Sequence, residues 1–307
     1  MKDTAIDISD VRHLYGDRTA LAGVTFDIRV GEAFALLGPN GSGKTTLFKL
    51  LCTLQPLQSG TITVFGHDVL QEPAAVRSTL GVTFQSPSLD KKLRVDENLH
   101  CHGRLYGLAG KKLRMRIDEV LDQFAVGDRR GDIVESLSGG LQRRVELAKC
   151  VMHQPKVLLL DEPSAGLDPS ARAELWCVLD SAKMSGVTVV VTTHLLEEAH
   201  RADRIAIIDE GQLAAIDTPA ALQSEIGGDI ITLRTENPQR LAEVITAALS
   251  IQAIPLDGTV RVDAGGEGGS ELAVRLYADF RDRIDELAIG KPTLEDVFIA
   301  RTGKRFD

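Results

Sequence analysis

The spacing of hydrophobic positions changes along the chain, and the changes divide it into segments of different structure. Short runs of apolar and β-branched residues predict strands over residues 5–8, 21–28, 33–37, 61–65 and 80–84, with a helix-like segment over residues 47–51. Between residues 96 and 152 apolar residues instead recur every three or four positions, which predicts helices over residues 96–107, 111–124 and 140–152. The chain therefore begins with a sheet and continues into a helical insertion.

Strands and helices alternate after this insertion. The pattern predicts strands over residues 157–160, 187–191 and 205–208, and helices over residues 170–184 and 195–202. Such alternation is typical of an α/β domain whose mostly parallel sheet is covered by helices. We place this domain at residues 1–226, because two glycines follow Ile226, and its helical subdomain at about residues 86–150.

The remaining residues, 227–307, predict a small α+β domain. Strands are expected over residues 230–234, 251–255 and 259–263 and near Leu287, and helices over residues 238–249 and 271–283. A β-α-β-β-α-β order of this kind suggests a ferredoxin-like unit. We interpret it as an accessory or regulatory domain.

Composition narrows the class of protein. The chain has 307 residues, of which 43% are hydrophobic and 26% charged, which is ordinary for a soluble protein with one large and one small domain. Its apolar runs are strand-sized, so we expect no transmembrane segment, and the N-terminus carries no recognisable secretory signal. The four cysteines are scattered, as expected in a reducing compartment. A net charge of -9 argues against non-specific nucleic-acid binding.

A glycine-rich stretch between the predicted strand 33–37 and the predicted helix 47–51 matches the pattern G-x-x-x-x-G-K-[ST]. Glycines let backbone N–H groups turn toward phosphate oxygens, and the helix N-terminus adds a positive dipole end. Lys44 would reach the β and γ phosphates, and Thr45 would bind Mg²⁺. The stretch therefore predicts a nucleoside triphosphate site, with Mg²⁺. It consists of Gly38, Pro39, Asn40, Gly41, Ser42, Gly43, Lys44, Thr45 and Thr46.

Two further motifs carry candidate chemistry. Asp161 and Glu162 follow the predicted buried strand 157–160, where α/β sheets place their ligands. Asp161 would hold the metal, and Glu162 would orient or deprotonate an attacking water. The second motif opens the predicted helix 140–152 and offers free backbone N–H groups to an anion, although an ordinary helix cap is the favoured explanation when the motif is seen alone. This motif comprises Leu137, Ser138, Gly139, Gly140 and Leu141.

The order and spacing of these motifs resemble those of ABC-type ATPases. The phosphate loop is followed by Gln85, by the Leu-Ser-Gly-Gly motif, by Asp161-Glu162-Pro163, by Asp168 and by His194. The resemblance covers residues 6–226 and implies an ABC-type nucleotide-binding domain with a mixed sheet, ATP as ligand and Mg²⁺ as cofactor.

The resemblance also implies individual roles. Tyr15 would stack on adenine, with core packing as the alternative. Gln85 would reach Mg²⁺ or the attacking water beside the ligands Thr45 and Asp161. Asp168 would communicate with a second subunit, and His194 would act as the switch histidine near the γ-phosphate. The motif at residues 137–141 would complete the ATP site of that second subunit, which implies a homodimer. Leu141 stands where many relatives have Gln, which puts in doubt only a side-chain contact near the ribose of the nucleotide.

Two segments narrow the resemblance further. Residues 293–303, which include Leu294, Val297 and Phe298, resemble the end of the ATPase subunits of type-2 ABC exporters, including the drug-resistance and Nod-factor branches. Residues 88–98 are similar to the part of these exporters that receives a helix of the membrane subunit. The implied partner is a separately encoded integral membrane permease, with this chain bound peripherally at the cytoplasmic face of the membrane.

Other interpretations fit less well. A soluble ABC ATPase acting on DNA or ribosomes would need long coiled coils between Lys44 and Ser138, or two such domains in one chain. An idle scaffold would not need the full set of candidate catalytic residues, whereas an importer ATPase remains an alternative. His100-Cys101-His102 invites a metal interpretation, but neighbouring residues on a helix point in different directions.

Overall fold

The computed structural model describes residues 4–86, 88–265 and 268–306. Its internal contacts divide the chain into two compact units, one ending at Leu213 and the other beginning at Ala214, within strand β10 (Gln212–Asp217). The hydrophobic pattern had placed the domain boundary later, after Ile226. The helix α8 (Pro219–Ile226) packs on a helix of the second unit, which explains why contacts group these residues with the C-terminal part.

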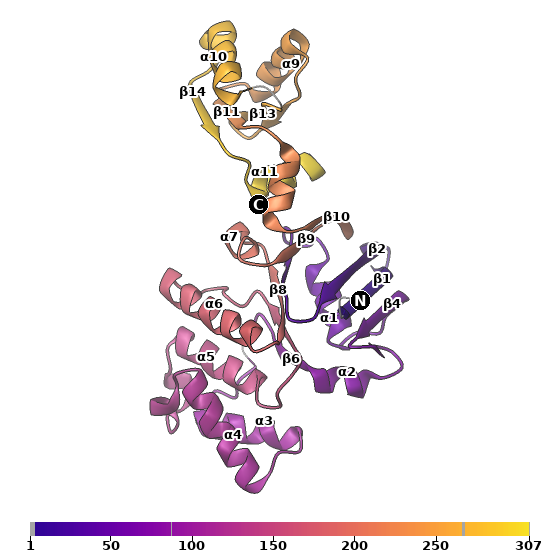
Figure 1. Ribbon diagram of the computed structural model, residues 1–307, viewed down its shortest axis with the longest axis vertical. Helices are drawn as coiled ribbons and strands as arrows, with labels where there is room; N and C mark the ends of the chain where they lie inside the picture. The colour runs from indigo at the N-terminus through magenta and orange to yellow at the C-terminus, as the bar shows by residue number, and fades with distance from the viewer. Residues whose placement is uncertain (1–3, 87, 266–267, 307) are drawn as a thin grey trace. The chain divides into compact units, whose positions relative to one another are not determined.

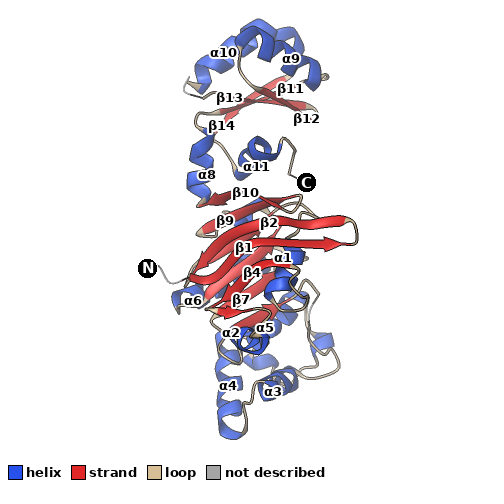
Figure 2. Cartoon of the chain, turned by 90° about the vertical axis from the view of Figure 1, so that its right-hand side faces the viewer, coloured by secondary structure: helices blue, strands red, loops and turns tan. Residues whose placement is uncertain are grey.

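The first unit begins with an antiparallel sheet. Its strands run in the order β2-β1-β4-β5, and Figure 2 shows β1, β2 and β4 side by side. The strands β1 and β2 are much longer than their predicted cores. The register of β1 shifts between Ile8 and Val11, which disrupts the two-residue period on which the prediction rests. The four strands are β1 (Thr4–Tyr15), β2 (Arg18–Arg29), β4 (Ser59–Val64) and β5 (His67–Asp68).

A parallel sheet forms the centre of the first unit. Its strands are ordered β10-β9-β3-β8-β7-β6, and every neighbouring pair from β9 to β6 is parallel. The side chains of β3, β7 and β8 are all buried, in agreement with the uninterrupted apolar runs that predicted these strands. Parallel strands end at one edge of the sheet, where a ligand site is expected. The strands are β3 (Ala33–Leu37), β6 (Leu80–Thr83), β7 (Val157–Asp161), β8 (Thr188–Thr193) and β9 (Arg204–Asp209).

Helices complete the first unit. The predicted helical insertion is confirmed, because α3, α4 and α5 pack on one another around a core that includes Leu99, Val120 and Val145, and they lie together in the magenta part of Figure 1. The predicted helix 195–202 is shorter than expected. The helices are α1 (Lys44–Leu51), α2 (Pro73–Thr79), α3 (Val95–Leu105), α4 (Gly110–Gln123), α5 (Gly139–Cys150), α6 (Pro169–Met184) and α7 (Leu196–Ala199), with short 3-10 turns η1 (Gly127–Arg129) and η2 (Val134–Ser136).

The second unit has the β-α-β-β-α-β order that the sequence predicts. Its sheet is antiparallel, with the strand order β12-β13-β11-β14, and α9 and α10 cover one face. The predicted helix 271–283 ends at Phe280 and continues as a 3-10 turn, η3 (Arg281–Arg283). The elements are β11 (Ile230–Arg234), α9 (Pro238–Leu249), β12 (Ala253–Leu256), β13 (Thr259–Asp263), α10 (Gly269–Phe280) and β14 (Glu286–Gly290).

The helix α11 (Leu294–Thr302) ends the second unit and carries the segment that sequence analysis singled out. Thr293 caps this helix in a reciprocal capping box with Asp296. Leu294, Val297 and Phe298 are buried, and α11 packs on α8. The apolar stripe of α11 therefore packs within the second unit.

None of the helices in the described residues combines the length and the apolar composition that a membrane span needs.

Candidate active site

Close packing explains why the phosphate loop is rich in glycine. A Cβ atom on Gly38 would lie 2.2 Å from the carbonyl oxygen of Ile208, and one on Gly43 would lie 2.6 Å from that of Ala20. Gly43 also has a φ of 113°, in the left-handed region that other residues avoid, and it stands immediately before α1. The loop is thus fixed between neighbouring strands, with the N-terminus of α1 behind it.

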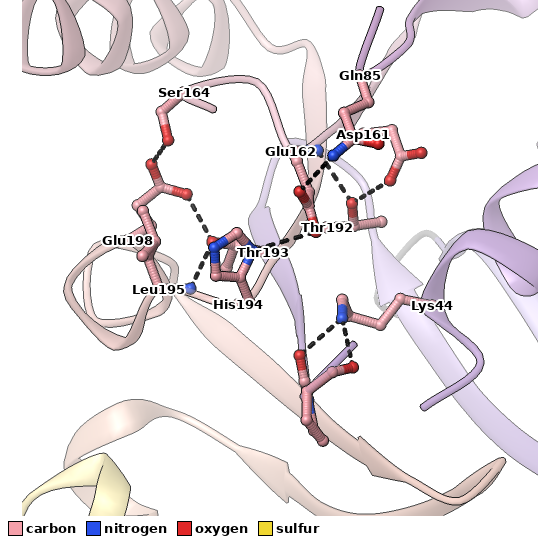
Figure 3. A network of polar contacts seen from close by, with 12 residues as sticks. Lys44, Gln85, Asp161, Glu162, Ser164, Thr192, Thr193, His194, Leu195 and Glu198 are labelled. Carbon is pink, nitrogen blue, oxygen red and sulfur yellow. Dashed lines mark hydrogen bonds and ion pairs between the residues drawn. The ribbon is translucent and has the colours of Figure 1, made fainter. Parts of the chain in front are cut away.

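Lys44 lies inside this loop. Its Nζ donates hydrogen bonds to the carbonyl oxygens of Gly38, at 2.6 Å, and of Pro39, at 2.9 Å (Figure 3). Burial lowers the pKa of Lys44, although the nearby carboxylates of Glu162 and Asp161 act in the opposite direction. A desolvated ammonium group close to the backbone N–H groups of the loop favours a multiply charged anion such as a triphosphate.

The predicted carboxylate pair lies at the end of β7. Asp161 is buried, and its Oδ1 accepts a hydrogen bond of 2.5 Å from the hydroxyl of Thr192 on the neighbouring strand β8. Burial raises the pKa of Asp161, while the hydrogen bond from Thr192 and the charge of Lys44 lower it. A bound cation would therefore stabilise the charged form of this buried carboxylate.

Glu162 connects three of the predicted residues. Its Oε2 accepts a hydrogen bond of 3.0 Å from Nε2 of Gln85, and its Oε1 lies 3.1 Å from Nδ1 of His194 (Figure 3). The backbone N–H of Glu162 donates to the hydroxyl and carbonyl oxygens of Thr192. The ends of three adjacent parallel strands, β6, β7 and β8, therefore bring together residues that are 77 and 32 positions apart in sequence.

A buried network behind this cluster was missed by sequence analysis. Glu198 on α7 accepts hydrogen bonds from the hydroxyls of Thr193, at 2.6 Å, and of Ser164. Ser164 lies on the segment after Glu162, and Thr193 precedes His194. Glu198 therefore ties the two segments that carry the candidate catalytic residues to each other. Its only sequence signal is a position four residues after His194.

Tyr15, the aromatic residue that the sequence singles out, lines a hollow beside the phosphate loop. The hollow is also lined by Arg18, Lys44 and Glu162, among other residues. Tyr15 is 44% exposed, which rules out the core-packing alternative, and its hydroxyl donates to Oε1 of Gln55 at 2.7 Å. The ring of Tyr15 is thus available at the rim, and Arg18 adds a cation that sequence analysis did not single out.

The Leu-Ser-Gly-Gly motif lines a different hollow of the same chain. The side chain of Ser138 accepts a hydrogen bond from the backbone N–H of Leu141 and so caps α5. The expected helix cap is therefore present. The exposed Gly139 and the half-buried Gly140 share the hollow with Asp168, which caps α6 through Ser170 and Ala171. Within one chain the motif therefore does not line the hollow of the phosphate loop.

A buried ion pair joins α5 to the segments that follow β6 and β7. Arg143 pairs with Glu146, and its Nε donates to the carbonyl oxygen of Pro163 at 2.8 Å. Glu146 accepts a hydrogen bond of 2.8 Å from the backbone N–H of Ser88, while Arg143 also donates to the carbonyl oxygen of Phe84. A movement of α5 would therefore be transmitted to both sides of Gln85 and to the residue after Glu162.

The His100-Cys101-His102 sequence forms no metal site. Among the described residues, no group of three or more metal-binding side chains comes together. His102 instead packs beside Tyr106, at a ring separation of 5.0 Å, and His153 stacks on Tyr106 at 3.7 Å. Burial lowers the pKa of His102 to about 4, and the nearby Lys149 and His153 act in the same direction.

His102 is expected to make the fold sensitive to acid. In the unfolded chain its pKa returns to about 6.5. Between that value and about 4 the unfolded chain binds a proton that the folded chain does not, so stability is lost as the pH falls through this window. Replacing His102 by Gln should lessen the drop in melting temperature between pH 7 and pH 5 by roughly 2 °C.

Thermal unfolding followed by circular dichroism at both pH values would measure this effect. His100→Gln is the matched control, because His100 lies exposed on the same helix. Equal acid sensitivity in the wild-type protein and in His102→Gln would contradict the prediction.

Fold and site together define a class of protein. A phosphate loop between a buried strand and a helix, facing a carboxylate pair at the ends of neighbouring parallel strands, is the arrangement of a nucleoside triphosphatase. Residues 21–165 match the family model described as ABC transporter. The chain belongs to the ATP-binding proteins of the ABC transporter family, and it is accordingly an ATP hydrolase.

Relatives match nearly the whole chain. It is 38% identical to the daunorubicin resistance ATP-binding protein DrrA3 of Streptomyces coeruleorubidus, over 99% of this chain and 97% of that protein. It is also 38% identical to the Nod factor export ATP-binding protein I of Sinorhizobium fredii, over 98% of this chain and 87% of that protein. The ATP-binding cassette MJ0796, solved as a dimer in a post-hydrolysis state with ADP and Pi, superposes with a TM-score of 0.63 and 25% identity, covering 69% of this chain and 98% of that one.

Proposed function

We propose that this chain is the ATP-hydrolysing subunit of an exporter, and that it acts as a homodimer bound to a separately encoded permease at the cytoplasmic face of the membrane. The observation that carries the proposal is the position of Glu162 between Gln85 and His194, beside the phosphate loop. Relatives named for drug resistance and for Nod factor export, which match both units of the chain, support the exporter assignment.

The residues around Glu162 suit hydrolysis of a phosphoanhydride. Lys44 and the loop N–H groups would bind the phosphates, and Glu162 would accept a proton from the water that attacks the γ-phosphate. Because a carboxylate only accepts hydrogen bonds, the contact between Nδ1 of His194 and Glu162 would require a proton on Nδ1. A neutral His194 then presents only an acceptor at Nε2, so it would have to be an imidazolium to donate to the γ-phosphate.

The donor set fits Mg²⁺. Thr45, Gln85 and Asp161 offer a hydroxyl, an amide oxygen and a carboxylate, which are the hard oxygen ligands that this ion prefers. The buried Asp161 carboxylate also lacks a full countercharge, since Lys44 donates to backbone carbonyls of the loop. Bound Mg²⁺ would neutralise charge on the phosphates.

The homodimer follows from the separation of the two candidate phosphate-binding motifs. Within one chain the hollow of Ser138 and Asp168 is distinct from the hollow of Lys44, so each motif has an exposed face available to a second copy. We infer that the Leu-Ser-Gly-Gly motif of one copy covers the ATP held by the phosphate loop of the other. The cassette MJ0796, which was solved as a dimer bound to ADP and Pi, supports a dimeric assembly.

A groove in the first unit suits the permease. Its walls are apolar, with Leu80, Val82 and Phe84 among them, and it lies beside the Arg143–Glu146 pair that links α5 to the region of Gln85. Arg77 and Lys149 also line the groove, and neither forms an ion pair with any described residue. We propose that a permease segment with an apolar side chain and a carboxylate binds here.

The proposal predicts that the chain purifies with a membrane protein. A tagged copy isolated from detergent-solubilised membranes of its native cells should retain an integral membrane protein, and the Lys149→Glu variant should retain several-fold less because like charges would then oppose each other. Lys112→Glu is the matched control, since Lys112 is exposed on α4 outside the groove. Recovery of the wild-type chain wholly from the soluble fraction, with no membrane protein attached, would contradict the exporter assignment.

A further inference from the structure

The two edges of the C-terminal sheet differ in their protection against pairing. The edge strand β12 contains Pro255, which has no N–H group to donate and discourages a further strand. The other edge strand, β14, contains no proline, and its three central residues are uncharged. It pairs with β11 in an unbroken register from Glu286 to Gly290. The edge of β14 thus lacks the proline, the lysine and the bulge by which proteins often block further pairing.

Exposed apolar side chains lie along this same edge. Ile289 of β14 is 44% exposed, and Ala288 is exposed as well. The helix α10 packs on β14 and β11, as Figure 1 shows, and two of its apolar residues, Val274 and Tyr277, are 71% and 46% exposed. Exposed apolar residues on an unprotected edge strand, and on the helix that packs on this strand, are a feature of interaction surfaces.

The sequence of β14 is compatible with antiparallel pairing to itself. With the two-fold axis at Ala288, Leu287 of one copy lies opposite Ile289 of the other, and Glu286 lies opposite Gly290. All five residues are then paired, apolar side chains meet apolar side chains, and no like charges oppose each other. A two-fold contact requires such self-complementarity, because the same surface serves both partners.

We propose that a second copy of this chain binds along β14, so that the two C-terminal sheets form one continuous antiparallel sheet and the α10 helices of both copies cover it. The proposal rests on the proposed function, because an ATP-bound homodimer would hold two C-terminal units in one assembly. A short strand pair is weak by itself, but tethering raises its effective concentration to the millimolar range. The contact would thus favour the closed dimer.

Disulfide cross-linking of the full-length chain tests this pairing. Directly opposed residues of antiparallel strands have Cα atoms about 4.5–5.5 Å apart, within the range that a disulfide spans. Ala288→Cys should therefore cross-link efficiently under mild oxidation with ATP present, in a Glu162→Gln background that retains ATP. The exposed native cysteines, Cys101 and Cys177, are first replaced by Ser, while Cys52 and Cys150 are buried and can stay.

Two matched variants make the result specific. Gln239→Cys, exposed on α9 away from β14, should give at least several-fold less cross-linked dimer. Adding Ile289→Lys to Ala288→Cys should reduce cross-linking to the level of Gln239→Cys, because a lysine on an edge strand opposes further pairing. Light scattering on each sample before oxidation reports separately whether the ATP-bound dimer has formed.

Each outcome bears on the proposal. An ATP-bound dimer in which Ala288→Cys cross-links no better than Gln239→Cys would overturn the β14 contact and leave the proposed function intact. Cross-linking at Ala288 without any ATP-dependent dimer would support the contact and count against the proposed function. Absence of both would overturn both, and capture of a different protein in native membranes in place of a second copy would overturn the assignment of the partner.

Discussion

Replacing Glu162 by Gln is expected to reduce ATP turnover by a factor of roughly 10²–10⁴, the usual contribution of a general base. The amide keeps the size of the side chain but cannot accept a proton from the attacking water. It can still accept a hydrogen bond from Gln85, and the hydrogen bonds of Lys44 within the phosphate loop do not involve position 162. ATP binding is therefore retained. The ATP-bound dimer should accumulate because ATP hydrolysis, the step that ends it, is blocked.

Phosphate release and light scattering in the presence of ATP and Mg²⁺ would measure the two effects. Glu119→Gln serves as the control, because Glu119 is an exposed glutamate on α4. Unchanged turnover in Glu162→Gln would remove Glu162 from the mechanism. Lost turnover without a longer-lived dimer would contradict the expectation that hydrolysis ends the ATP-bound dimer.

Mixing two inactive variants is expected to restore ATP hydrolysis. Lys44→Ala removes the cation of the phosphate loop, and Ser138→Arg obstructs the hollow beside the N-terminus of α5. In a dimer of one variant with the other, both defects fall in one composite site, and the second site has an intact Lys44 and an intact Ser138. Random pairing should therefore recover about a quarter of the wild-type sites, against nearly none in either variant alone.

A mixture of Lys44→Ala with the double variant Lys44→Ala/Ser138→Arg is the matched control, since no pairing of these chains yields an intact site. Its phosphate release should stay at background. If the first mixture also stays at background while mixed dimers are detected, each ATP site would have to lie within one chain, and the two hollows would need another explanation.

The sequence was sufficient to predict the parts of the site that depend on neighbouring residues. The phosphate loop is contiguous, and the φ of 113° at Gly43 is a local backbone conformation that favours glycine. The meeting of Gln85, Glu162 and His194 was expected from the order of motifs in a known family. The structure supplies the physical cause, which is that β6, β7 and β8 are adjacent and parallel and end at one edge.

Contacts carried by single polar side chains could not be predicted in this way. Thr192 supports Asp161, and Glu198 joins Ser164 to Thr193, yet single Thr and Glu residues are too common to signal a buried role. The long strand β1 was underestimated because its bulges interrupt the alternation of apolar and polar residues. In each case the missing information concerns partners distant in sequence.

The backbone at Glu162 has a consequence for the evolution of this protein. Its φ is 45°, a left-handed value that costs a residue with a Cβ atom about 1 kcal/mol or more and that glycine adopts freely. A glycine at this position would relax the backbone and remove the carboxylate at once. Selection for heat resistance alone would thus favour glycine at position 162, and the resulting cassette would not hydrolyse ATP. The glutamate persists only as long as turnover is itself under selection.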